Sequence, residues 1–222
     1  MADTIPKPRA RGRPRADDAA AVSRDAILCR ALELFAAVGY QGFSLRELAR
    51  DLGVSHGLIN VRFGSKDDLW RACVEWGLAH LAERLDATPR TGPIEERFRH
   101  AVIQTLLAIE AVPPLLQLVN HEAATESARL AFLTETIIED RYAVLEDIVR
   151  EGIRQGKFRD VPPHMVFLLV AHGGGAVFTL KPLSRRLGLL STADGNEIRT
   201  QAAEIAEFAL RGIAVSAIGN AQ

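Results

Sequence analysis

The side chains best suited to reading another molecule through hydrogen bonds lie between residues 55 and 66. Ile59 and Phe63 are four residues apart, so they should face inward on one short helix and leave an outer face without a carboxylate. An asparagine amide can pair bidentately with adenine, and an arginine can reach guanine or phosphate. We therefore single out Asn60 and Arg62; the less favoured alternative for Asn60 is contact with water or a capping role. The outer face comprises His56, Gly57, Asn60, Val61 and Arg62.

Two short helices with a tight turn must position this face. Ser44 and Glu47 form a capping box that predicts a helix start, and Gly53 is the residue type that best tolerates the conformation after a helix end. Ser55 then predicts the cap of the next helix only two residues later. A longer helix from about residue 23 to Gly39 precedes the pair. The pattern predicts a helix-turn-helix, in which the second helix enters the major groove of DNA.

The residues that begin and flank this unit could also contact DNA. Ser44 combines a predicted capping role with a phosphate contact. Arg46 is either a phosphate clamp or a solvated surface charge, and the sequence favours neither.

The run FSLRELARDLGVSHG at 43–57 and the closing FGSK at 63–66 resemble the signature of the TetR family of bacterial regulators, with a match over about residues 23–70. The resemblance implies a homodimer in which three N-terminal helices bind operator DNA and a larger helical domain binds a small effector. It also implies that residues 55–63 form the recognition helix and that Lys66 touches phosphate, as a cation at a helix N-terminus can. Asn60 departs from the family, in which an aromatic residue is common here, so no base preference carries over.

Positive charge is concentrated at the start of the chain. Among residues 1–15, Lys7, Arg9, Arg11, Arg13 and Arg15 outnumber the single Asp3, a balance of +4; the whole chain carries −1, so residues 16–222 sum to −5. We expect residues 1–20 to be a flexible basic arm, with Arg11 and Arg13 as candidates for the minor groove, whose negative potential attracts arginine. The alternative is a solubilising tail.

Beyond residue 17 the apolar pattern is helical, with no convincing alternation of a strand, so we predict an all-α fold. We expect a helix-turn-helix domain at 21–70 and a helical effector-binding and dimerisation domain at 71–222. A fourth helix should run to about residue 86. Further helices are predicted near 93–110, 114–127, 128–155, 163–180 and 196–217, separated by glycine and proline.

The segment 165–178 is apolar nearly all round and must be covered by its own domain, by a second subunit or by both. Dimerisation is a natural solution. The three glycines at 173–175 lack the spacing of a nucleotide loop; they could permit close helix approach, local bending or room for a ligand, and the sequence does not choose among these.

An effector pocket is expected among the middle helices, because such pockets are mostly apolar with a few directing polar groups. For every candidate, ordinary core packing is the competing interpretation. The effector would be a small molecule, favoured only slightly to be lipophilic or aromatic. The apolar candidates are Phe98, Val102, Leu106, Leu116, Phe132 and Phe167, and the polar ones are Gln104, Asn120, His121 and His172.

The sequence offers little support for catalysis or for membrane insertion. His121-Glu122 lacks the second histidine of a zinc-protease helix, because residue 125 is threonine. No cofactor, metal or catalytic residue is predicted, and no membrane span or secretory signal, so we expect a cytoplasmic protein. The favoured function is a repressor released by its effector. The alternatives are an activator, a DNA binder regulated by a protein partner, a non-specific architectural DNA binder, and an all-α enzyme with a vestigial helix-turn-helix.

Overall fold

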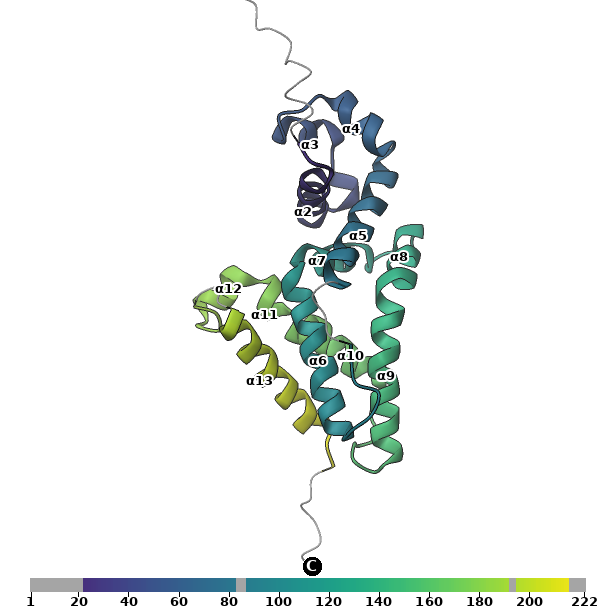
Figure 1. The fold of residues 1–222 in the computed structure, drawn as a ribbon, viewed down its shortest axis with the longest axis vertical. Coiled ribbons are helices and arrows are strands. Elements are labelled where there is room, and N and C mark those ends of the chain that lie inside the picture. The colour runs from purple at the N-terminus through teal and green to yellow at the C-terminus, as the bar shows by residue number, and fades with distance from the viewer. Residues whose placement is uncertain (1–21, 83–86, 192–194, 216–222) are drawn as a thin grey trace, which may run out of the picture.

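The computed structural model describes residues 22–82, 87–191 and 195–215, and it shows an elongated bundle of helices (Figure 1). Within these residues there is no strand, only an isolated bridge between Phe158 and Ala214. The all-α prediction is therefore confirmed. In Figure 1, α2, α3, α4 and α5 occupy one end, α6, α9, α10 and α13 form the other, and α7 and α8 lie between them.

Four helices form the N-terminal end: α2 (Arg24–Gly42), α3 (Leu45–Asp51), α4 (His56–Phe63) and α5 (Lys66–Ala82). The hydroxyl of Ser23 caps α2 by accepting a hydrogen bond from the backbone N–H of Ala26 at 3.0 Å. Gly39 has a φ of 70° and interrupts α2, as expected of a helix-ending glycine, but one more turn follows it. Fully buried side chains tie the four helices together: Leu28, Phe35, Leu48, Ile59, Trp70 and Cys73.

This first core does not stop at the N-terminal helices. It includes Leu115 and Leu118 of α7 (Pro113–Glu122) and Leu133 at the end of α8 (Ala128–Leu133). Helices α5 and α7 approach closely at Gly77, where an added Cβ would lie 2.9 Å from the nearest Leu115 methyl carbon. The boundary expected after residue 70 therefore falls inside a continuous core.

A second core joins α6 (Ile94–Ala111), α9 (Glu139–Arg154) and α13 (Gly195–Ile213). It is completed by α10 (Pro163–Leu168), the π-helical turn η2 (Leu169–Gly174) and α11 (Ala176–Thr179). Its fully buried members include Phe98, Val102, Leu106, Val149, Phe178, Ala202 and Ala206.

Two local features depart from the predicted helices. The segment predicted as one helix at 128–155 contains a π-helical turn, η1 (Thr134–Ile138), between α8 and α9. The segment 181–195, expected to be a linker, begins with α12 (Lys181–Arg186). Ser184 is buried in α12 and its hydroxyl donates to the carbonyl oxygen of Val177 at 2.9 Å. Six residues are too few for hydrophobic periodicity to reveal this helix.

Among the glycines at 173–175, Gly174 serves close packing and Gly173 does not. A Cβ at Gly174 would lie 2.9 Å from a side-chain carbon of Ile205 in α13 and 3.1 Å from one of Leu106 in α6. A Cβ at Gly173 would meet nothing within 4 Å. Close approach of η2 to two helices therefore accounts for Gly174 but not for Gly173.

Among the described helices, none is by itself both long and apolar enough to cross a membrane. Helices α6 and α7 reach that length and hydropathy only as a pair, and they are bent by 92° relative to each other.

Candidate nucleic-acid interface

Two serine caps and one glycine shape α3, α4 and the turn between them. The backbone N–H of Glu47 donates to Ser44 Oγ at 3.4 Å, and that of Leu58 donates to Ser55 Oγ at 3.2 Å, so both predicted caps are confirmed. Gly53 has a φ of 66°, and the N–H of Val54 reaches back to the carbonyl of Ala49 at 2.9 Å. This bond closes a Schellman motif, which turns the chain within two residues. Helix α4 is thereby held against α3 in a helix-turn-helix.

The outer face of α4 is open to solvent. His56, Gly57, Asn60, Val61 and Arg62 are all exposed, and Val61 is 87% exposed. Such exposure of a valine is unusual on a helix that also buries Ile59 and Phe63. A Cβ at Gly57 would meet nothing within 4 Å, so the backbone there is accessible to a partner.

The two polar side chains singled out on α4 already have protein partners. The Asn60 amide nitrogen lies 3.3 Å from His56 Nδ1, one helical turn away. The Arg62 guanidinium donates to the carbonyl oxygen of Val22 at 2.7 Å, which links α4 to the residue before α2. Because a guanidinium has five N–H donors, this one bond leaves Arg62 donors for a contact with DNA. Its role there stays a prediction.

Two other predicted contacts lie at helix starts. Arg46 is exposed in the first turn of α3 and forms no ion pair with the described residues, whereas Arg50 lies 3.8 Å from Glu47. Lys66 begins α5; its ammonium donates to the carbonyl of Phe43 at 2.8 Å and lies 4.5 Å from the centre of the Tyr40 ring. Burial lowers the pKa of Lys66, and Arg129 lowers it further. Arg46 is thus free to reach phosphate, while Lys66 also braces the turn before α3.

The start of α5 carries a capping box in which both reciprocal bonds are present. The backbone N–H and hydroxyl of Ser65 both donate to Asp68 Oδ2, at 2.9 and 2.6 Å, and the N–H of Asp68 donates back to Ser65 Oγ at 3.1 Å. These bonds lower the pKa of Asp68 from its ordinary value. The remaining candidates, Arg11 and Arg13, lie outside the described residues.

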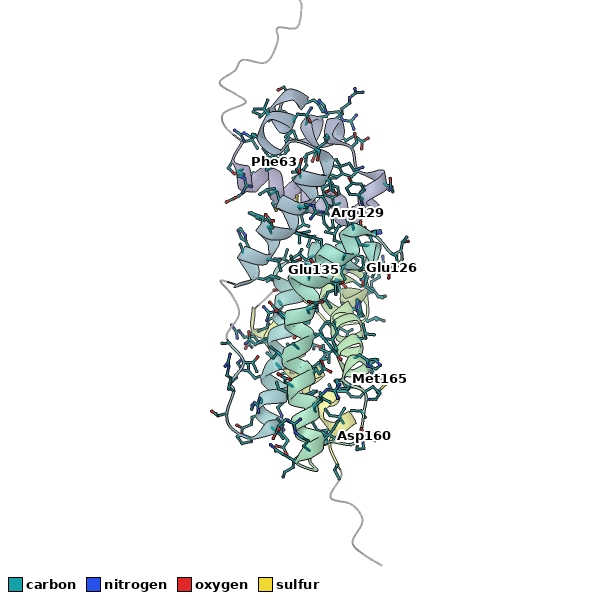
Figure 2. The ribbon with its side chains drawn as sticks, turned by 90° about the vertical axis from the view of Figure 1, so that its right-hand side faces the viewer. Phe63, Glu126, Arg129, Glu135, Asp160 and Met165 are labelled. Carbon is teal, nitrogen blue, oxygen red and sulfur yellow. The ribbon has the colours of Figure 1, made fainter. Side chains whose placement is uncertain are left out.

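Where the N-terminal helices meet the rest of the protein, two cations, Arg129 and Lys66, both lie against the Tyr40 ring. Arg129 of α8 lies 3.8 Å from the centre of the Tyr40 ring, which also contacts Lys66. The Arg129 Nε donates to the buried carboxylate of Glu122 at 2.9 Å. In Figure 2, Arg129 lies between Phe63 near one end and Met165 toward the other. Arg129 therefore connects Lys66 to α7.

The candidate effector residues do not form one pocket. Phe98, Val102 and Leu106 are fully buried in the second core, as the core-packing alternative anticipated. Phe132 packs on Trp70 in the first core, and Phe167 packs edge-on against Tyr142. Leu116 is half-buried in α7 and Asn120 is exposed there, while His172 is half-buried in η2. Only Gln104 lines a cavity described below.

His121 serves the junction between the two ends of the molecule. Its Nε2 lies 2.9 Å from the carbonyl oxygen of Ala36 in α2, so this nitrogen carries the proton. A Cβ at Gly39 would lie 3.6 Å from His121 Nδ1, so the break in α2 fits against the imidazole. His121 thus contacts the N-terminal helices and lines neither cavity below.

Residues 27–73 match the family profile described as bacterial regulatory proteins, tetR family. The chain is therefore similar to transcriptional regulators of the TetR family. It is 26% identical over 154 residues to the HTH-type transcriptional regulatory protein RaaS of Mycobacterium tuberculosis, an alignment that covers 68% of each chain.

Solved TetR structures share the fold over most of this chain. A bacterial regulatory protein of the family from Rhodococcus is 22% identical, with a TM-score of 0.64 over 88% of this chain and 100% of its own. The regulator PfmR from Thermus thermophilus is 23% identical, with a TM-score of 0.59 over 88% of this chain and 99% of its own. The likeness therefore extends beyond the DNA-binding helices to the second core.

Two hollows are lined by described residues of the second core. The first, of about 840 Å³, is a mostly apolar groove between the η2 region and α13. Met165, Leu169 and Phe208 line it and are exposed, Phe208 by 81%. The sequence pattern anticipated exposed apolar surface on 165–178 but not Phe208. That residue lies on an otherwise amphipathic helix, where one phenylalanine does not reveal which neighbour lies opposite.

The second hollow, of about 850 Å³, lies between α6, α9 and residues 87–90. Its polar lining includes Arg90, Arg97, Arg141, Asp147 and Gln104. Of these residues, only Gln104 was predicted from the sequence to line a pocket. Charged residues on amphipathic helices are usually solvated, and only the tertiary arrangement brings these around one cavity.

Proposed function

We propose that this protein is a TetR regulator that binds a near-palindromic operator as a homodimer, acts as a repressor, and leaves the DNA when a small molecule binds its second core. The carboxylate-free, solvent-exposed face of α4 is the observation that carries this proposal. The protein would act by binding and not by catalysis, and in the cytoplasm. Its related proteins are named as transcriptional regulators, which supports this assignment.

The proposed DNA contacts divide by role. Asn60, Val61 and Arg62 would face base edges, Gly57 would admit close approach, and Ser44, Arg46 and Lys66 would contact phosphates. The arginines of the basic arm would enter the minor groove. The full proposed set is Arg11, Arg13, Ser44, Arg46, Ser55, His56, Gly57, Asn60, Val61, Arg62 and Lys66.

The apolar groove supports the homodimer. Leu169 and Phe208 are 64% and 81% exposed, and Met165 and Leu168 add 42% and 52%. These exposed apolar side chains of α10, η2 and α13 would pack against the same faces of a second copy related by a two-fold axis. The second copy would then complete the cover that the sequence predicts for residues 165–178.

The two cations against the Tyr40 ring support a route from effector to DNA. Movement of α7 would act on Glu122, then on Arg129 and the Tyr40 ring, and so on Lys66 at the start of α5. A ligand that binds the non-DNA state more tightly shifts the population, and its coupling to DNA, typically about 1–3 kcal/mol, is reciprocal. The two α4 helices must match half-sites about one helical turn or a multiple apart. A shift of α5 would alter the distance between the two α4 helices.

Selection of duplexes from a random pool by the full chain tests the proposal. We expect an enriched inverted repeat, bound by two subunits as measured by sedimentation. An architectural binder would show no enriched sequence once binding is compared at several salt concentrations, because its affinity comes from phosphates alone. That result, or a stable monomer at micromolar concentration, would contradict the proposal.

A further inference from the structure

The hollow between α6, α9 and residues 87–90 differs in chemistry from the apolar groove. Its floor is apolar, made by Ala101 of α6 with Leu145 and Ile148 of α9, all of them buried. Its volume of about 850 Å³ lies in the usual range for small-molecule sites, about 300–1,000 Å³. A ligand could therefore place an apolar body on this floor.

The polar lining carries an excess of positive charge. Arg90, Arg97 and Arg141 supply three guanidinium groups, and Asp147 supplies the one carboxylate in the described lining. Arg97 is held in place because its Nε donates to the carbonyl oxygen of Pro89 at 3.0 Å, in the segment that closes one side. Each guanidinium has five N–H donors, so this bond leaves donors for a ligand.

Arg141 lies at the start of α9 and lines the hollow without an ion pair to any described residue. Arg141 is exposed to solvent; the protein atoms around its guanidinium lower its pKa, and the neighbouring Asp140 opposes that shift. An exposed guanidinium without an ion pair to the described residues keeps N–H donors available to a ligand. An anion bound in the hollow would supply the missing partner.

We propose that this cavity is the effector site and that its ligand joins an apolar body to an anionic head group, either a carboxylate or a phosphate ester. That a ligand bound here would act as an effector rests on the proposed function. That the cavity binds such a ligand does not. We assign the apolar groove to contact with the second copy instead, because Leu169 and Phe208 line the groove and are exposed to solvent.

The position of the cavity suggests how binding reaches the first core. Helix α6 carries Arg97, Ala101 and Gln104 on the cavity wall and ends at Ala111. Helix α7 begins two residues later at Pro113, and its Leu115 packs in the first core. A shift of α6 on ligand binding would therefore move α7, which carries Glu122 toward Arg129.

Calorimetric titration of the full chain with octanoate, octyl phosphate and octanol tests the site. We expect at least one of the two anions to bind about tenfold or more tightly than the alcohol, since a hydrogen bond to a charged group is stronger than a neutral one. Arg141→Gln should weaken that anion about tenfold and leave octanol unchanged. Arg150→Gln is the matched control, because Arg150 lies on the same helix, pairs with Glu146 and does not line the cavity.

Asp147→Asn gives an independent readout, because removing the only described carboxylate of the lining should tighten anion binding. Asp147→Asn still tests the site if the Arg141→Gln variant is unfolded, which circular dichroism would reveal. Equal binding of all three probes, or equal losses in Arg141→Gln and Arg150→Gln, would overturn the site. Anion binding that leaves a selected operator duplex bound would support the site and contradict the proposed release.

Discussion

At the scale of single residues, α4 combines a fixed backbone with side chains held only by weak or exchangeable bonds. Ile59 and Phe63 are buried, so they set the orientation of the helix. On the opposite face, the Asn60 amide nitrogen lies 3.3 Å from His56 Nδ1, and the Arg62 guanidinium donates to one backbone carbonyl oxygen. Both bonds can be exchanged for bonds to a base edge at small net change in free energy, because a hydrogen bond to water or protein is replaced by another.

Asn60→Ala should lower affinity for a selected operator about tenfold or more, since a bidentate base contact contributes on the order of 1–3 kcal/mol of discrimination. Binding to unrelated duplexes should not change, because phosphate contacts dominate it. Fluorescence anisotropy with both duplexes measures this. Asn120→Ala, an exposed asparagine of α7, is the control. An equal loss on both duplexes would mean that Asn60 supports the fold and does not read bases.

At the scale of elements, the capping boxes decide where helices begin and how the turn between them is shaped. Ser44, Ser55 and Ser65 each accept a hydrogen bond from a backbone N–H at the third residue after them. The start of α5 is the most heavily bonded, because Asp68 also accepts from Ser65. Since Gly64 ends α4 immediately before it, this box fixes the angle at which α5 leaves the DNA-binding helices.

The Ser65–Asp68 capping box should make the free energy of unfolding depend on pH. The folded protein holds the pKa of Asp68 below its ordinary value of 3.8, so this contribution is present above the unfolded pKa and is lost as pH falls through the folded pKa. We expect Asp68→Asn to be less stable than wild type at pH 7, with the difference shrinking below about pH 4. Urea denaturation across pH measures it. Ser65→Ala should show the same trend, and a difference independent of pH would contradict the role of the charged carboxylate.

At the scale of the whole molecule, the two cores would divide the proposed binding of DNA and of ligand between them. The first contains the helix-turn-helix together with α7, and the second contains both hollows. The exposed Phe208 and Leu169 lie on the second core, far from α4 along the molecule. A contact between two copies there would therefore set the spacing of the two recognition helices.

Phe208→Glu should convert the dimer to a monomer and reduce operator binding at least tenfold, because a charge would enter an apolar contact and each half-site would lose its neighbour. Sedimentation and anisotropy measure the two effects. Leu187→Glu is the control, since Leu187 is 65% exposed and lies outside the groove. A dimer that survives Phe208→Glu would place the interface elsewhere.

The sequence by itself determined the local features. The serine caps, the left-handed Gly53 and the spacing of apolar residues predict α3, α4 and the turn between them, because these depend on contacts within a few residues. The same reasoning predicts the all-α class and most helix boundaries. It missed α12 and the π-helical turns, which depend on packing against distant helices.

Only the tertiary structure decided which residues meet across the chain. It places α7 in the first core, stacks Arg129 on Tyr40, and sends Phe98, Val102 and Leu106 into packing and not into a pocket. It also gathers Arg90, Arg97 and Arg141 around one hollow. Helical periodicity states which side of a helix is buried but not what lies opposite, because the facing partner is set by packing between segments far apart in sequence.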